Sequence, residues 1–456
     1  MLIYIGEISD AYYYGVYNII KMLYPVSEIT RTDKEKADLT FTFSVSKDGV
    51  TVYINGFPHT STIISGDVSL TLKRCIYDAS GKSLPFGAFT GIRPVKGLKR
   101  YGKSAFREIF LADPQKTEVT AKCAEWEDKI SKKIKKRSAA LYVNIPFCPT
   151  RCAYCSFTAA NYSKNLADSY FNAVMYELSQ TLKAFSDSNI SPLCAYIGGG
   201  TPTVLTSGQL GEMCRKIKDK FPDMQEFTVE AGRPDTIDKE KMKALYENGV
   251  TRISINPQSL NENTLKKIGR RHTADDFMRA YDTAKNAGIM KINTDIIAGL
   301  PDETLLDFKH TLSEIIKLNP TDITVHTLCK KRCSDMDLSE FSPYSDTEKM
   351  LDFAYETLSE KYEPYYIYRQ KNALGALENV GFIRDNNACM YNIVMMEETA
   401  SVVAVGAGSA SKLIGFNDKK PFSKLRDDKN PQRYISQIEE ITAKKRRFLE
   451  DGADKI

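Results

Sequence analysis

Residues 141–155 read Leu-Tyr-Val-Asn-Ile-Pro-Phe-Cys-Pro-Thr-Arg-Cys-Ala-Tyr-Cys. An apolar run that predicts a buried strand leads directly into Cys148, Cys152 and Cys155, which form a C-x3-C-x2-C pattern. Three thiolates this close together can bind three corners of a cubic iron–sulfur cluster and leave the fourth iron without a protein ligand. A structural zinc site needs four ligands, and no further His or Cys stands near this loop in the sequence. The stretch therefore predicts a 4Fe–4S cluster with one open iron.

The chain on both sides of this loop alternates short apolar runs with amphipathic stretches, from residue 139 to about residue 327. This alternation is the βα pattern of a parallel sheet. The expected strands are 141–145, 195–197, 226–230, 252–255, 291–296 and 323–326. The expected helices are 166–185, 207–221, 239–248, 274–287 and 304–318. Six such units with right-handed crossovers predict an incomplete barrel, which binds ligands at the carboxyl ends of its strands.

Residues suited to ligand binding follow several of the predicted strands. Gly198-Gly-Gly-Thr-Pro-Thr203 follows the second strand, and glycine lets the backbone approach a ligand closely. Glu230 ends the third strand, Gln258 follows the fourth, and Asp295 lies on the fifth. Arg270 stands twelve residues beyond Gln258, and its planar guanidinium suits bidentate binding of a carboxylate. Because successive strand ends of one parallel sheet meet at one edge, we expect these residues to form one site.

The cysteine pattern, with the aromatic Tyr154 before its last cysteine, resembles the signature of the radical S-adenosylmethionine (SAM) superfamily. In that superfamily the open iron binds the methionine moiety of SAM, and an electron cleaves the sulfonium to a 5′-deoxyadenosyl radical. The resemblance narrows to the oxygen-independent coproporphyrinogen III oxidase family, also called coproporphyrinogen dehydrogenase. The matching segments are Tyr142-Val-Asn-Ile-Pro-Phe-Cys148, Tyr196-Ile-Gly-Gly-Gly-Thr-Pro-Thr203, Gln258 with Arg270, and Asp295-Ile-Ile-Ala-Gly-Leu-Pro301.

The resemblance implies a fold, a set of cofactors and a set of site residues. The fold is α/β, a partial (β/α)6 TIM-like barrel of radical SAM type with an N-terminal and a C-terminal α+β domain. The cofactors are a 4Fe–4S cluster and SAM. The implied cluster ligands are Cys148, Cys152 and Cys155. The residues implied to contact SAM are Tyr142, Tyr154, Gly199, Gly200, Thr201, Glu230, Gln258, Arg270, Asp295 and the backbone at Cys329.

Three domains are expected: an N-terminal α+β domain, the partial barrel, and a C-terminal domain that covers the substrate. Their predicted ranges are 1–137, 138–335 and 336–456. In the first domain, residues 1–5 indicate a strand, and the alternating segments 39–43 and 49–54 flank Asp48-Gly49, which predicts a hairpin. Helical character is expected at 71–77 and 103–111. The turn-rich segment 84–94 is either a functional loop with Arg93 and Lys96 or a packed connection.

The C-terminal part resembles the HemZ-type branch of the family, on residues 365–372, 378–382 and 406–412. Aromatic side chains beside Arg369 and Lys371 would suit a flat macrocycle that carries propionates, with Arg93 as a third propionate candidate. A core strand is the alternative interpretation of the aromatic run. The glycines of Gly406-x-Gly408 allow a close approach of the backbone.

The family resemblance implies oxidative decarboxylation of coproporphyrinogen III to protoporphyrinogen IX, in porphyrin and haem biosynthesis. The implied partners are a tetrapyrrole substrate and an electron donor such as flavodoxin or ferredoxin. Two departures leave the substrate open. The oxidase proper carries a fourth cysteine where this chain has Ser156-Phe157, and residues 1–137 do not resemble the short N-terminal arm of the oxidase. A haem-carrying chaperone of a sister branch and a radical SAM enzyme on another substrate are the alternatives.

Composition describes an ordinary soluble protein of 456 residues, with 42% hydrophobic and 27% charged residues. The net charge of +5 is small and the charges are interspersed, so nothing indicates binding to nucleic acid or a membrane surface. The basic segment 129–137 is interpreted as a solvated helix face or linker. No apolar run is long enough to cross a membrane. We expect a cytoplasmic protein without an integral membrane segment.

The chain has ten cysteines, and a cytosolic chain of this length is not expected to use them in disulfides. Three are assigned to the cluster. Five others are interpreted as small buried hydrophobic residues: Cys75, Cys123, Cys194, Cys214 and Cys389. Cys329 and Cys333 form a second C-x3-C pattern after the sixth strand, which could serve a cluster or metal, although no further ligands stand beside it.

Overall fold

The structure, a computed structural model, describes residues 1–155, 160–329, 336, 341–370, 373, 376–416 and 421–456. The chain divides into two compact units. The first unit contains Met1–Ala124, Thr327–Lys330 and Ile367–Asn379. The second unit contains Glu125–His326, Lys331–Tyr366 and Val380–Ile456, and it holds all but one of the predicted site residues.

The first unit is a five-stranded sheet with the strand order β2-β1-β3-β4-β5. Its elements are β1 (Leu2–Ile5), α1 (Asp10–Leu23), β2 (Glu28–Thr30), β3 (Leu39–Val45), β4 (Gly49–Ile54), β5 (Phe57–Thr62), α2 (Val68–Ser80), α3 (Pro94–Tyr101) and α4 (Lys103–Glu108). Phe41 and Val52 of the sheet share a hydrophobic core with Ile20 of α1 and Ile76 of α2. The predicted strand at 1–5 and the predicted hairpin are confirmed, since β3 and β4 pair antiparallel.

The turn-rich segment 84–94 is a packed connection. Leu84 and Phe86 are buried, and the buried Arg369 donates hydrogen bonds to the carbonyls of Phe89 and Ala376. The predicted role of Arg369 as a propionate ligand is therefore wrong, because its guanidinium is buried and hydrogen-bonded to backbone carbonyls of the first unit. The core-strand interpretation of the aromatic run is confirmed, since Tyr365 is buried in β14 (Glu363–Arg369). Lys371 lies outside the described residues, and the role of Arg93 stays a prediction.

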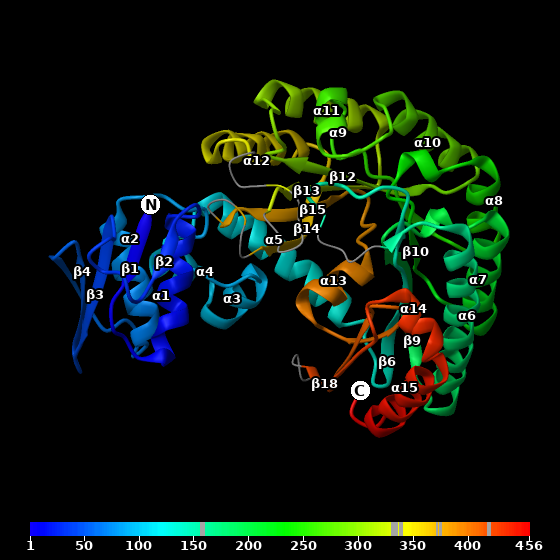
Figure 1. Cartoon of the computed structure of the whole chain (residues 1–456), viewed down its shortest axis with the longest axis horizontal. Helices are drawn as coiled ribbons and strands as arrows, with labels where there is room; N and C mark the ends of the chain where they lie inside the picture. Colours follow the sequence, from blue (N-terminus) through cyan, green and yellow to red (C-terminus); the bar gives the residue numbers. More distant parts are fainter. Residues whose placement is uncertain (156–159, 330–335, 337–340, 371–372, 374–375, 417–420) are drawn as a thin grey trace. The chain divides into compact units, whose positions relative to one another are not determined.

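The second unit is built on parallel strands in the predicted βα order. These strands are β6 (Ser138–Ile145), β9 (Ser191–Gly199), β10 (Phe227–Glu230), β11 (Arg252–Ser254), β12 (Lys291–Ala298) and β13 (Asp322–Thr327). The helices between them are α6 (Lys164–Asp187), α7 (Ser207–Lys220), α8 (Lys239–Glu247), α9 (Glu262–Lys267), α10 (Ala274–Asn286) and α11 (Leu305–Leu318). Figure 1 shows these helices following one another along the outer side of the curved sheet. All six predicted strands and all five predicted helices are confirmed, and α9 is additional.

Three of the outer helices begin at capping boxes, which explains why their starts could be predicted. The hydroxyls of Thr206, Thr273 and Thr304 each accept a bond from the backbone N–H three residues on. In each box the Gln or Asp at that third position accepts a bond from the backbone N–H of the threonine. The reciprocal bonds satisfy two backbone donors that a helix start leaves open.

The sheet continues beyond the predicted strands at both edges, in the order β14-β15-β13-β12-β11-β10-β9-β6-β16-β17-β18. At one edge β16 (Ser401–Val405) runs parallel to β6, and β17 (Ala410–Ile414) and β18 (Pro421–Arg426) follow antiparallel. At the other edge β15 (Glu378–Ile383) pairs antiparallel with β13. Residues of the predicted C-terminal domain thus share the sheet of the barrel. The three-domain division stays a prediction.

The remaining elements are short strands, 3-10 turns and five further helices among the described residues. They are α5 (Pro114–Ser131), β7 (Phe147–Cys148), β8 (Ala160–Asn161), η1 (Pro202–Val204), η2 (Pro234–Thr236), α12 (Tyr344–Leu358), α13 (Met390–Glu397), α14 (Pro431–Ser436) and α15 (Ile438–Gly452). The five cysteines interpreted as buried hydrophobic residues are buried, and none of these five forms a disulfide bond. Within the described ranges, no helix has both the length and the hydropathy needed to cross a bilayer.

A buried ionic cluster joins the C-terminal helix to the barrel. The ammonium group of Lys445, on α15, is 2.6 Å from Asp427 Oδ2 and also donates to Glu177 on α6. All three side chains are almost fully buried. Since a buried charge without a partner is costly, each member of this cluster depends on the others.

We expect Lys445→Met to destabilise the full chain by about 3–5 kcal/mol, because two buried carboxylates lose their counter-charge. The free energy of unfolding in urea measures this loss. Lys444→Met is the matched control: its ammonium pairs with Glu440 in solvent, so its removal should leave the stability nearly unchanged. Equal losses in the two variants would contradict the stabilising role of the buried cluster.

Candidate functional site

The three cysteines lie on the loop that leaves β6, at the carboxyl edge of the sheet. Two hydrogen bonds from the glycine loop after β9 brace this segment: Gly200 N–H donates to Ile145 O at 2.8 Å, and Thr201 N–H donates to Phe147 O at 2.7 Å. Cys155 N–H donates to Cys152 O at 3.0 Å, which closes a tight turn. The backbone of the loop is thus fixed by the neighbouring strand end.

The three thiols lie close enough together that Cys152 and Cys155 affect the pKa of Cys148 electrostatically. Burial raises the pKa of the Cys148 thiol, a hydrogen bond from the Thr201 hydroxyl opposes this, and Cys155 and Cys152 raise the pKa further. In the part of the chain that the structure describes, no three His, Cys, Asp or Glu side chains converge as ligands of a single metal ion. A cubic iron–sulfur cluster does not require three ligands around one metal ion, because each of the three cysteines binds a different iron.

The glycine loop comes so close to the cysteine loop that a side chain does not fit. A β-carbon on Gly200 would lie 2.5 Å from Phe147 O and 3.0 Å from Cys148 Sγ. Gly199 has a φ of 115°, a backbone conformation that residues with a side chain rarely adopt. Because neither glycine has a side chain, the end of β9 packs directly against the cysteine loop that follows β6.

Glu230, at the end of β10, is poised to ionise near neutral pH. Its carboxylate accepts hydrogen bonds from the Tyr196 hydroxyl at 2.6 Å and from Gly199 N–H at 3.3 Å. Burial raises the pKa of Glu230 to about 7; these two hydrogen bonds oppose the rise, and the charge of Asp295 adds to it. A cation bound beside this carboxyl would favour its ionised form.

Asp295, on β12, stays ionised although it is buried. Burial alone would raise its pKa, but hydrogen bonds from His326, Asn293 and Thr324 hold the pKa of Asp295 below its usual value. His326 Nε2 lies 3.6 Å from its Oδ2, and Asn293 Nδ2 lies 2.7 Å from its Oδ1. The site thus holds two carboxyl groups with different pKa values: that of Asp295 is lowered, and that of Glu230 is raised to about 7.

Arg270 and Gln258 bring unused hydrogen-bonding atoms to the same edge. The Arg270 guanidinium donates to Asn256 O at 2.8 Å and to the Tyr154 hydroxyl at 3.0 Å. Gln258 has a φ of 67°, and its backbone bonds to Asp295 and Ile297 of β12. Within the described residues, Arg270 Nε and Gln258 Oε1 are buried without a partner. Buried polar atoms of this kind call for a ligand or water.

Tyr142 belongs to a stack of three tyrosines inside the barrel. Its ring centroid is 6.2 Å from that of Tyr196 and 5.8 Å from that of Tyr391 on α13, with interplanar angles of 24° and 13°. Burial, with the charge of Glu230 as a second cause, raises the pKa of Tyr142. The sequence did not predict Tyr391, because nothing local indicates that α13 packs against these strands.

The structure brings twelve of the thirteen predicted site residues to strand ends or loops of the second unit. Cys329 lies in the first unit, where it is buried and its backbone forms an isolated β-bridge with Ala373. Its backbone contact with SAM stays a prediction. Cys333 lies outside the described residues. Three supporting residues were missed: Asn144 donates to Ala407 O, Gly269 packs on the backbone of the cysteine loop, and Arg233 contacts Cys152.

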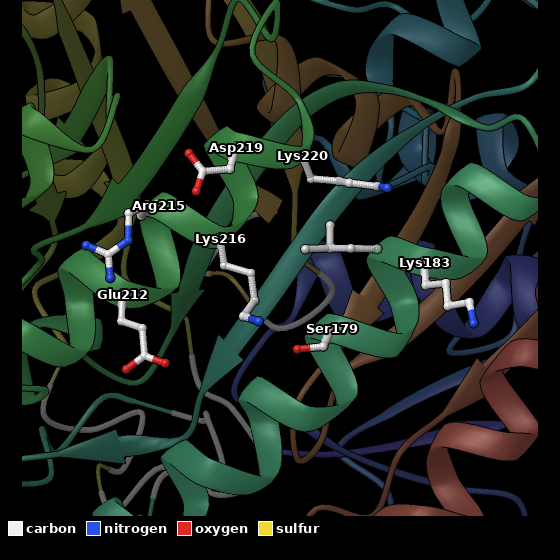
Figure 2. A pocket seen from close by; sticks show the side chains of 8 residues that line it. Ser179, Lys183, Glu212, Arg215, Lys216, Asp219 and Lys220 are labelled. Atoms are coloured by element: carbon white, nitrogen blue, oxygen red, sulfur yellow. The ribbon is translucent and has the colours of Figure 1, made fainter.

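A separate charged groove of about 540 Å³ lies between the outer helices α6 and α7 (Figure 2). Its charged lining residues are Lys183, Glu212, Arg215, Lys216, Asp219 and Lys220. The groove contains none of the predicted site residues, so its side chains serve below as controls for changes at the strand ends.

Comparison with known proteins gives the class of this site. The sequence profile of the radical SAM superfamily matches residues 142–315, which span the cysteine loop and the strand ends described above. The solved structure of coproporphyrinogen III oxidase (HemN) from Escherichia coli superposes with a TM-score of 0.54 at 19% identity, over 70% of this chain and 73% of that chain. That likeness shows the fold. The chain is a radical SAM protein, and a 4Fe–4S cluster and SAM, the expected cofactors, are those of this superfamily.

Full-length similarity defines the family more narrowly. The chain is 31% identical to the oxygen-independent coproporphyrinogen-III oxidase-like protein HemZ of Bacillus subtilis, over 99% of this chain and 98% of that protein. The chain belongs to the HemZ family. It is also 34% identical to the heme chaperone HemW of Bacillus subtilis, over 41% of this chain and 49% of HemW. Oxygen-independent coproporphyrinogen III oxidase of Salmonella typhimurium is 29% identical over 41% of both chains.

Glu230→Gln should change how stability depends on pH. A carboxyl with a folded pKa of about 7 and an unfolded pKa of 4.5 loses stability as pH rises through this window, because ionisation is disfavoured in the fold. The glutamine cannot ionise. We expect the variant to gain on the order of 3 kcal/mol relative to the parent between pH 4.5 and pH 7.

Urea unfolding of the cofactor-free protein at a series of pH values measures this difference. Glu212→Gln, an exposed residue of the groove in Figure 2, is the control and should follow the parent at every pH. A constant difference between Glu230→Gln and the parent would show that the pKa of Glu230 is not raised.

Proposed function

We propose that this chain is a radical SAM enzyme that acts on a propionate-bearing tetrapyrrole and converts coproporphyrinogen III to protoporphyrinogen IX. In this proposal Cys148, Cys152 and Cys155 hold a 4Fe–4S cluster, and the strand ends beside them hold SAM. The observation that carries the cofactor assignment is the convergence of Glu230 and Arg270 with the braced cysteine loop.

The residues fit the parts of SAM by their chemistry. Glu230 and Asp295 accept hydrogen bonds from ammonium or hydroxyl donors. Arg270 keeps Nε free of protein partners within the described chain and suits a carboxylate. Gly199 and Gly200 carry no side chain that would keep the methionine end away from the backbone. When bound, the two cofactors together supply reductive cleavage of the sulfonium and a carbon radical that removes a hydrogen atom from the substrate.

The substrate assignment is supported by the full-length similarity to HemZ, which is described as like the oxygen-independent coproporphyrinogen-III oxidase. In the proposed reaction each of two propionate side chains loses a hydrogen atom from its β-carbon. The substrate radical that remains would pass one electron to an oxidised one-electron carrier and lose its carboxylate as carbon dioxide, which leaves a vinyl group. We propose reduced flavodoxin or ferredoxin as the source of the electron for SAM cleavage, and the cytoplasm as the place of the reaction.

A second candidate function is haem carriage. One observation favours it: the fourth cysteine that follows the cluster motif in the oxidase is replaced by Ser156-Phe157. The similarity to the heme chaperone HemW covers 41% of this chain. In that case the cluster site would remain, but the tetrapyrrole would be bound and delivered unchanged.

The product of an anaerobic reaction separates these functions. Protein with a reconstituted cluster is mixed with dithionite, SAM and coproporphyrinogen III, and the products are separated by mass. We expect 5′-deoxyadenosine together with protoporphyrinogen IX. No vinyl product in this reaction, together with stoichiometric retention of haem in a parallel sample that contains haem instead of coproporphyrinogen III, would favour the chaperone. Production of 5′-deoxyadenosine with an unchanged tetrapyrrole would indicate another substrate.

Cysteine variants test the cluster ligands independently of the substrate. We expect Cys152→Ala to lose most of the bound iron and sulfide after reconstitution, since one of only three protein ligands is removed. Cys214→Ala, which truncates a buried free thiol on α7, is the control and should keep the cluster. Equal iron content in the two variants would contradict the ligand assignment.

A further inference from the structure

Arg233 has a contact that the proposed function does not use. It follows β10 and is only 4% exposed. One guanidinium nitrogen, Nη1, lies 3.8 Å from Cys152 Sγ and 3.0 Å from Thr150 Oγ1. A buried cation thus donates directly to the sulfur of a proposed cluster ligand.

The opposite side of the same guanidinium is paired with Asp235. Nε and Nη2 donate to the two carboxylate oxygens at 3.0 and 2.9 Å. This bidentate pair of hydrogen bonds orients the guanidinium of Arg233 so that Nη1 faces the cysteine loop. Asp235 is 24% exposed, whereas Arg233 is 4% exposed, so the positive charge is the more deeply buried member of the pair.

A second donor reaches the same group of sulfurs. The Thr201 hydroxyl lies 3.5 Å from Cys148 Sγ. The charge of Arg233 also favours the ionised form of Cys148. The sulfurs of Cys148 and Cys152 therefore each face a hydrogen-bond donor, and of these two donors Arg233 is the one that carries a full charge.

Hydrogen bonds to the cysteine sulfurs and nearby charge set the reduction potential of an iron–sulfur cluster. Reduction adds one negative charge to a group that three thiolates already make negative. A buried cation beside a sulfur stabilises the reduced form more than the oxidised form, because charges interact strongly where water is excluded. A carboxylate at the same distance has the opposite effect.

We infer that Arg233 is a positioning residue that raises the reduction potential of the cluster, and that Asp235 moderates this effect. The inference rests on the proposed assignment of Cys148, Cys152 and Cys155 as cluster ligands. The pair would set how readily the cluster accepts the electron that SAM cleavage requires. A purely structural bridge between β10 and the cysteine loop would change stability or cluster content, but it would not move the potential in a charge-dependent direction.

The test is an anaerobic redox titration of the reconstituted protein without SAM, followed by the electron paramagnetic resonance signal of the reduced cluster. We expect Arg233→Met to shift the midpoint potential to a more negative value and Asp235→Asn to shift it to a more positive one. Arg233→Lys, which keeps the charge, should lie between Arg233→Met and the parent. Arg215→Met, in the groove of Figure 2, removes an arginine of the same unit and should leave the potential unchanged.

Unchanged potentials in both the Met and the Asn variants, or shifts of the same sign, would overturn the inference while leaving the cluster assignment intact. If Arg233→Met assembles no cluster, Asp235→Asn decides, and a potential at or below that of the parent overturns the inference. A parent protein that binds no iron–sulfur cluster would overturn both this inference and the proposed function.

Discussion

A cubic cluster held by three cysteines has one corner that the polypeptide leaves open, and the geometry of the barrel end fits that constraint in the proposed assignment. The open corner needs a ligand of its own, so the strand ends beside it must offer room, hydrogen bonds and charge. In this chain Gly199 and Gly200 let the end of β9 pack directly against the cysteine loop, where a β-carbon would not fit. The charge comes from Glu230 and Asp295, one titrating and one permanently ionised.

The cysteine loop has little secondary structure of its own and is held by its neighbours. The glycine loop after β9 donates two backbone hydrogen bonds to it, Arg270 binds the hydroxyl of Tyr154, and Arg233 binds Thr150 and Cys152. Two strand ends and the connection after α9 thus hold the cysteine loop in place. Preorganisation of this kind reduces the cost of ordering the loop when a cofactor binds. The same contacts place charged groups next to the sulfurs, so positioning and electronic tuning use the same side chains.

The barrel strands could be predicted from the sequence because each is a short apolar run bounded by a helix with a clear start, such as the capping box at Thr304. The site residues could be predicted because chemistry at strand ends repeats in order along the chain. The missed contacts depend on distant partners. Arg233 meets Cys152 across 81 positions, and Asn144 meets Ala407 across 263. The aromatic run at β14 was ambiguous because a core strand and a ligand surface can have the same composition, and burial decides between them.

In the proposed assignment, cofactor binding and the chemistry that follows both depend on the open iron. Mössbauer spectroscopy of protein reconstituted with iron-57 observes it directly, with and without SAM. We expect the four irons of one cluster, with one of them changing its spectrum when SAM is added. An iron–sulfur cluster whose spectrum does not respond to SAM, or a protein that binds zinc and no iron, would contradict this assignment.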